Sequence, residues 1–138
     1  MIHEEIVTYE VAKLAKEKGF PQKFNYSKFT PRYNYYNHNE ELNGDVGDIL
    51  KLRLKHKPIP EEMEPITAPT HSQLQRWLRE ERGYYVYPFF DNEELNWTYV
   101  VREKTGDMWI PLIGETFYYD CFDESMEDGI KFVLENLV

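Results

Sequence analysis

The stretch THSQLQRWLREERGYYVYPFF, residues 70–90, joins a helix pattern to a strand pattern and decides the fold. Thr70 is a favourable N-cap, and Gln73 three residues later completes a capping box. An apolar stripe follows at helical spacing: Leu74, Trp77 and Leu78. Gly83 is typical of the residue that follows a helix. The pattern predicts a helix over 70–82 that must pack on a sheet, because so short a helix is marginal alone.

Strand patterns follow this helix. The run YYVYPFF (84–90) contains Pro88, which has no amide hydrogen to donate and therefore favours an edge strand. The runs NWTYVVRE (96–103) and MWIPLI (108–113) flank a glycine-containing turn, which predicts a hairpin. The run ETFYYDCF (115–122) is a candidate for one more strand.

Two further helices are predicted near the chain ends. Thr8 precedes a periodic apolar pattern that stops at Gly19, so a helix is expected over 8–18. A second apolar stripe at helical spacing begins with several carboxylates, which are favourable in the first turns of a helix. This pattern predicts a helix over 123–137. Helices interspersed with hairpins predict an α+β fold in a single domain, 1–138: an antiparallel sheet with about three helices packed on one face.

Composition narrows the class of protein. The formal net charge is −9, from 25 acidic and 16 basic residues, and 16% of the residues are aromatic, eleven of them tyrosines. Disordered chains are poor in aromatic residues, so the chain is expected to fold. The lone Cys121 forms no internal disulfide, the N-terminus lacks a signal-peptide pattern, and no apolar run is long enough to span a bilayer. A cytoplasmic protein without membrane contact is predicted.

Two segments carry a family resemblance. APTHSQLQRWLRE (68–80) resembles the pattern A-P-T, six residues, W-L-R-E, and YDCFDESMEDGI (119–130) resembles Y-E-S-Y-E-E-A-L-E-A-G. The chain thereby resembles small proteins from gut Bacteroidetes genomes and their phages or prophages, a group without an assigned activity. The resemblance implies a fold and a phage or mobile-element origin. Cys121 stands where the pattern has serine, which weakens the expected cap of the last helix.

The tyrosine-rich segment 25–39, NYSKFTPRYNYYNHN, has the composition of an adaptable binding surface. On a strand, Tyr35 and Tyr36 point to opposite faces, so at least one of Tyr26, Tyr33, Tyr35 and Tyr36 is expected to be exposed. The candidate binding residues are Arg32, Tyr33, Tyr35 and Tyr36. The alternative is ordinary sheet packing, because tyrosine favours strands.

A basic patch is predicted within DILKLRLKHK, residues 48–57. Leucines and cations alternate there, which indicates a strand with Leu50, Leu52 and Leu54 on its buried face. The opposite face would carry four cations: Lys51, Arg53, Lys55 and Lys57. Such a face could bind a phosphate or an acidic partner, or it could simply protect an exposed strand from edge pairing.

Duplex DNA is not an expected ligand. Gln75, Arg76 and Arg79 lie opposite the apolar stripe of helix 70–82, as in a helix that reads the major groove. The alternative is a solvated helix face in which Arg76 pairs with Glu80. Prolines occupy the place of the partner helix, and phosphate backbones repel an acidic chain.

Catalysis has little support in the sequence. His3, His38, His56 and His71 lack zinc-site spacing, and there is no glycine-rich phosphate loop, so no metal or cofactor is predicted. Cys121 has no nucleophile signature and is expected to be buried. The leading hypothesis is a non-enzymatic binding protein with a protein partner or a homodimer. The alternatives are an acidic nucleic-acid mimic that inhibits a host DNA-binding enzyme, and an enzyme of unrecognised type.

Overall fold

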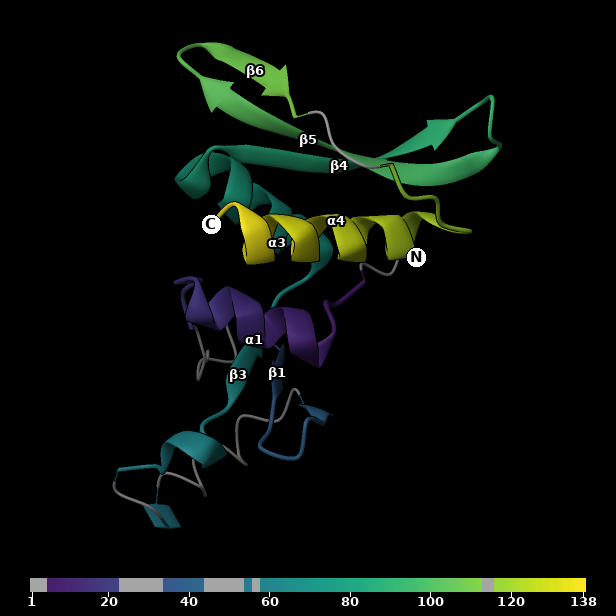
Figure 1. The fold of residues 1–138 in the computed structure, drawn as a ribbon. Helices are drawn as coiled ribbons and strands as arrows, with labels where there is room; N and C mark the ends of the chain where they lie inside the picture. The colour runs from purple at the N-terminus through teal and green to yellow at the C-terminus, as the bar shows by residue number, and fades with distance from the viewer. Residues whose placement is uncertain (1–4, 23–33, 44–53, 56–57, 113–115) are drawn as a thin grey trace, which may run out of the picture. The chain divides into compact units, whose positions relative to one another are not determined.

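The computed structural model describes residues 5–22, 34–43, 54–55, 58–112 and 116–138, and it has the predicted α+β class with antiparallel sheets (Figure 1). Its contacts define two compact units. The N-terminal unit is Thr8–Pro69, and the C-terminal unit is Met1–Val7 together with Thr70–Val138. Each unit has its own sheet. The helices therefore pack on two separate sheets and not all on one. The single domain stays a prediction.

The sheet of the C-terminal unit is an antiparallel meander. Its strands are β4 (Tyr84–Asp91), β5 (Asn96–Thr105) and β6 (Met108–Pro111), in the order β4-β5-β6. The predicted hairpin is therefore confirmed, and Pro88 lies in an edge strand as expected. Pro111 ends the other edge strand, so both edges of this sheet contain a proline.

The helix predicted over 70–82 is confirmed, with one change of geometry. Helix α3 (His71–Trp77) continues as the π-helical segment η2 (Leu78–Arg82). Thr70 and Gln73 form the predicted capping box. Gly83 closes the helix with φ 75°, a conformation that costs glycine little because it has no Cβ.

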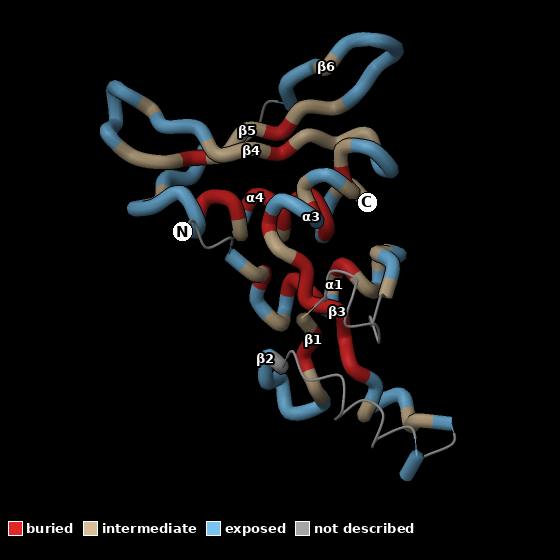
Figure 2. Tube along the Cα trace, turned by 180° about the vertical axis from the view of Figure 1, so that it is seen from behind, coloured by how far each residue is buried: buried red, intermediate tan, exposed pale blue. Residues whose placement is uncertain are grey.

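One face of this sheet is covered by helices. Helix α4 (Phe122–Asn136), close to its predicted range, contacts β4 and β5, while α3 contacts β4 and α4 (Figure 1). A Cβ atom added to Gly129 of α4 would lie 2.8 Å from a methyl group of Val86 and 2.9 Å from the Tyr99 ring. Buried residues of this unit gather where these helices meet the strands (Figure 2). The core includes Leu74, Leu78, Val86, Ile130, Val133 and Leu134.

The N-terminal unit is smaller. Helix α1 (Tyr9–Glu17) has the predicted Thr8 cap, and its sheet has the order β2 (Leu42–Asn43), β1 (Asn34–Tyr36), β3 (Ile66–Ala68). Helix α1 packs against β3, all of whose residues are buried. A 3₁₀ turn, η1 (Glu61–Met63), precedes β3.

Three sequence expectations differ from the structure. Residues 54 and 55 are helical and Leu54 is 75% exposed, so the prediction of a strand with Leu54 on its buried face is wrong at this point. Leucine and lysine both have high helix propensity, so their alternation does not specify a strand. In 115–122 a single bridge, Tyr119 to Trp97, replaces the candidate strand in the described part. Trp77, expected to be buried with Leu74 and Leu78, is half-buried, and the guanidinium of Arg82 lies 5.1 Å from its ring centroid.

Candidate functional site

The strongest candidate site is the face of the C-terminal sheet that lies opposite α4. Side chains along a strand alternate between faces. Since Val86 and Tyr99 meet Gly129 on the covered face, their neighbours in the sequence lie on the other face, here named the open face. Its residues include Tyr85, Tyr87, Phe89, Val100, Arg102, Lys104 and Trp109, together with Asp91 and the buried Thr98. Among the described residues of this unit, β6 packs mainly against β5, and α4 lies on the covered side.

Arg102 is held in place on the middle strand of the open face. Its Nε donates a hydrogen bond to the Tyr87 hydroxyl at 3.0 Å, and its Nη1 donates to the Trp109 carbonyl at 3.4 Å. The Tyr85 ring centroid lies 4.9 Å from that of Tyr87 and 6.2 Å from that of Trp109. Three aromatic rings from the two edge strands therefore surround one guanidinium group on the middle strand.

Two more cations join this group. The guanidinium of Arg79, in η2, lies 5.4 Å from the centroid of the Tyr85 ring, within the range of a cation–π interaction. Lys104 is the cross-strand partner of Trp109 and is exposed. The six side chains form what we name the aromatic–cation cluster: Arg79, Tyr85, Tyr87, Arg102, Lys104 and Trp109.

The cations of the aromatic–cation cluster have no acidic partners in the described part of the chain. None of the ion pairs found there involves Arg79, Arg102 or Lys104. A chain with net charge −9 has carboxylates in excess, so three unpaired cations beside three aromatic rings form a distinct surface. The arrangement can bind an anionic group and an apolar group side by side.

The far end of the open face has a different character. Phe89 is 50% exposed and Tyr118 is 42% exposed. The Tyr118 hydroxyl donates to a carboxylate oxygen of Asp91 at 3.2 Å. Hydrogen bonds from the backbone N–H groups of Glu93 and Glu94, and the one from Tyr118, lower the pKa of Asp91, so this carboxylate stays ionised at neutral pH. The open face therefore has a cationic end and an anionic end, with apolar rings between them.

The predicted tyrosine site lies elsewhere and is largely enclosed. Tyr35 is 3% exposed and Tyr36 is 9% exposed, so neither of these two is the exposed tyrosine that was expected, and Tyr26 and Tyr33 lie outside the described residues. Strand β1 is the middle strand of its sheet, and both of its faces are covered. The Tyr36 ring meets the Tyr9 ring of α1 edge to face at 5.5 Å. The other two candidates, Arg32 and Tyr33, lie outside the described residues.

The predicted basic patch is not assembled in the described residues. Lys51, Arg53 and Lys57 fall outside them, and Lys55 is exposed in a helical conformation. The prediction of one strand face carrying these cations is therefore wrong at Lys55, for the reason given above for Leu54.

The outward face of α3 is used within the fold. Arg76 pairs with Glu80 at 3.1 Å, which confirms the expected helix pair. Gln75 donates from Nε2 to the Val86 carbonyl at 2.7 Å, so this side chain ties α3 to β4. With Arg79 over Tyr85, two of the three residues proposed for groove reading contact the sheet instead. The absence of duplex DNA binding stays a prediction.

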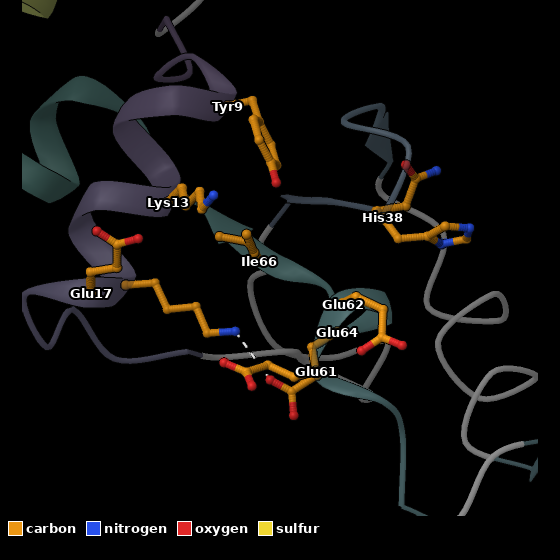
Figure 3. Close-up of a pocket in the computed structure, with 10 residues that line it drawn as sticks. Tyr9, Lys13, Glu17, His38, Glu61, Glu62, Glu64 and Ile66 are labelled. Carbon is orange, nitrogen blue, oxygen red and sulfur yellow. Dashed lines mark hydrogen bonds and ion pairs between the residues drawn. The ribbon is translucent and has the colours of Figure 1, made fainter.

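A polar cavity of about 500 Å³ lies in the N-terminal unit (Figure 3). Lys16 from α1 pairs with Glu64 across it at 3.2 Å. Its lining mixes cations, carboxylates and neutral groups: Tyr9, Lys13, Lys16, Glu17, Asn37, His38, Glu61, Glu62, Glu64 and Ile66. No group of three His, Cys, Asp or Glu residues in the described chain could hold a metal ion. The cavity is therefore lined by groups of both charges, and this lining indicates no particular ligand or reaction.

Two further polar residues of the C-terminal unit, His71 and Cys121, belong to its helices. His71 is buried and its Nε2 lies 2.5 Å from a carboxylate oxygen of Glu127, which links α3 to α4. Cys121 is exposed, so the expectation of a buried cysteine is wrong. It occupies the N-cap position of α4 without a side-chain cap, as the serine-to-cysteine departure predicts. Its place at the helix boundary, ahead of the first buried turn, explains its exposure.

The residues of the aromatic–cation cluster were missed from the sequence, although a signal was present. In YYVYPFF, aromatic residues recur with a period of two at Tyr85, Tyr87 and Phe89, the positions that alternate with Val86. Comparison of the chain with protein-family models, curated proteins and solved structures gave no match. Among the described residues, no helix has the length and apolar character needed to cross a membrane.

Proposed function

We propose that the protein is a small, non-enzymatic binding protein of the cytoplasm that acts through protein–protein contacts at its open face. The observation that carries this proposal is the aromatic–cation cluster. Tyrosine, tryptophan and arginine are enriched among the residues that dominate binding energy at protein interfaces. Here all three types lie together on one sheet face, with Arg102 already fixed by two hydrogen bonds.

Exposed apolar residues extend the surface beyond the cluster. Phe89 and Tyr118 lie at its far end, 50% and 42% exposed. Large contiguous apolar patches are uncommon on proteins that act alone and mark interaction sites. The family resemblance adds a phage or mobile-element origin to the proposal.

The two other hypotheses have weaker support. A nucleic-acid mimic needs carboxylates spaced along one exposed face, whereas the exposed carboxylates here lie on many separate elements of both units. The described cavity gathers titratable groups of both signs without a nucleophile–base pair. A protein-binding role therefore remains the best supported, with a homodimer as one form of it.

The test is affinity purification from the native host with quantitative comparison of baits. The first bait is the wild-type chain, and the second carries Tyr87→Ala and Trp109→Ala. The matched control is Phe132→Ala, an aromatic residue of α4 that is 39% exposed on the helix side. We expect partners, or self-association in sedimentation analysis, to be lost with the second bait and kept with the control. Equal capture by all three folded baits contradicts the proposal.

A further inference from the structure

We infer that the partner presents a short acidic segment, whose carboxylates bind the cations of the aromatic–cation cluster and whose apolar side chain covers the exposed rings. This inference rests on the proposed function and gives the partner its chemistry.

Arg102 is prepared to bind a carboxylate. Of the five N–H groups of a guanidinium, Arg102 uses one on Nε and one on Nη1 in its two hydrogen bonds, so three remain. Both bonds fix the plane of the group before any ligand arrives, which reduces the ordering cost of binding. A carboxylate accepts two parallel N–H bonds from such a group and is therefore its natural ligand.

The surroundings of Arg102 strengthen this preference. Arg102 and Arg79 are half-buried, each in contact with an aromatic ring or its hydroxyl. Near a partly dehydrated surface, charge interactions are stronger than in bulk water. Lys104 adds an exposed cation on the same side. Three cations without carboxylate partners in the described residues, on a chain with net charge −9, are complementary to a negatively charged partner.

The rest of the open face limits the ligand to a short acidic segment. Asp91 is ionised at the far end, and Glu93 and Glu94 are exposed near it. These carboxylates repel a continuous polyanion such as single-stranded nucleic acid. The rings are also poorly arranged for base stacking, since Tyr85 is inclined by 38° to Tyr87 and by 63° to Trp109.

The geometry also predicts the spacing within the segment. Arg102 and Thr98, the cross-strand partner of Phe89, are four residues apart on β5, which is about 13 Å at strand rise. An extended partner segment would therefore have its carboxylate about four residues from an apolar side chain. The carboxylate would lie at the cationic end and the apolar side chain over Phe89.

The test is selection of short random peptides displayed on yeast against the folded full-length chain. We expect enriched peptides to combine Asp or Glu with an apolar residue at this spacing. Synthetic copies should bind about tenfold or more weakly to the Arg79→Gln, Arg102→Gln double variant, measured by fluorescence anisotropy. The matched control, Arg76→Gln, removes a cation of α3 that is paired with Glu80 outside the cluster, and it should keep wild-type affinity.

The other outcomes separate the two proposals. Enriched peptides that lack carboxylates, and that bind the double variant as well as the wild type, overturn the acidic partner and leave the open face as a protein-binding surface. No enrichment over a Tyr87→Ala, Trp109→Ala bait overturns both. Binding of oligo(dT) that is lost in the double variant, without acidic peptides, assigns the surface to nucleic acid and also overturns the inference.

Discussion

The two faces of the C-terminal sheet are built from the same strands and differ in almost every physical respect. On the covered face, Val86 is fully buried and Val101 is 5% exposed, and Gly129 lets α4 approach them. On the open face, the neighbouring Tyr85 and Arg102 belong to the aromatic–cation cluster. One residue step along a strand thus separates a position that holds the fold together from a position free to bind. The amino-acid composition of the strands averages over both faces and does not show this difference.

The largest expected effect compares adjacent valines of β5. Val101→Ala removes buried methyl groups and should lower the free energy of unfolding by about 2–3 kcal/mol, from lost transfer energy and a residual cavity. Val100→Ala, the same change on the open face, should cost less than about 1 kcal/mol because that side chain is only half-buried. Urea denaturation of both variants measures the difference. Equal losses would show that the open face is as tightly covered as the other.

A second prediction concerns the close approach of α4. Gly129→Ala places a methyl group 2.8 Å from Val86 Cγ2, and overpacking of this kind costs about 1–3 kcal/mol. The better helix propensity of alanine returns up to about 1 kcal/mol, so a net loss of about 1 kcal/mol is expected.

Val86→Ala supplies the partner for a double-mutant cycle. If the two side chains collide, the double variant should be more stable than the sum of the single losses predicts. Strict additivity in urea denaturation would mean that the helix moves away from the strand without cost, and that Gly129 does not set their separation.

A smaller, pH-dependent effect is expected at Tyr119 on the covered side. Burial, a hydrogen bond to Asp128 and the negative charge of Asp128 raise the pKa of Tyr119 above its ordinary value of 10.0. The folded state therefore favours the neutral hydroxyl. Its contribution to stability is complete below the unfolded pKa and is lost as pH rises from there towards the folded-state pKa.

The measurement is the urea midpoint between about pH 9 and about pH 11. Tyr119→Phe cannot ionise, so its midpoint should fall less steeply over this interval than that of the wild type. Parallel pH profiles for the two proteins would assign the alkaline loss to other groups, among them Tyr99, whose pKa burial also raises.

The smallest effect is expected at the cationic end of the open face. Arg102→Gln should change the free energy of unfolding by less than about 1 kcal/mol, because the lost hydrogen bonds lie at a half-buried surface. Thermal unfolding followed by circular dichroism is a sufficient check. A loss comparable with that of Val101→Ala would identify Arg102 as a structural residue and remove the main support for the open face as a binding site.

The sequence predicted elements whose signals are local. The Thr8 cap, the Thr70–Gln73 capping box and the β5–β6 hairpin each depend on residues a few positions apart, and each is present. The α+β class followed from their order. The alternating pattern was misleading at Leu54 and Lys55, which are helical, since alternation specifies a strand only when a second strand and a core are available to it.

The candidate site was less predictable because it depends on tertiary packing. Tyr35 and Tyr36 were expected to divide between a core and solvent, but their strand is central and enclosed on both sides. Arg79 reaches Tyr85 only because η2 precedes the turn at Gly83 and lies beside β4. Side chains on a strand form two alternating sets, and the set on the face that a helix covers is buried. The sequence of the strand alone does not determine which face that is.

The prolines in the two edge strands have a consequence for behaviour at high concentration. A sheet edge with free N–H and C=O groups invites another chain to extend it, and proline removes a donor at the place where extension would begin. Pro88 and Pro111 do this at opposite edges. Phe89, Met108 and the rings of the open face can therefore stay exposed with less risk of fibril growth, because side-chain contacts can form without backbone pairing propagating from copy to copy.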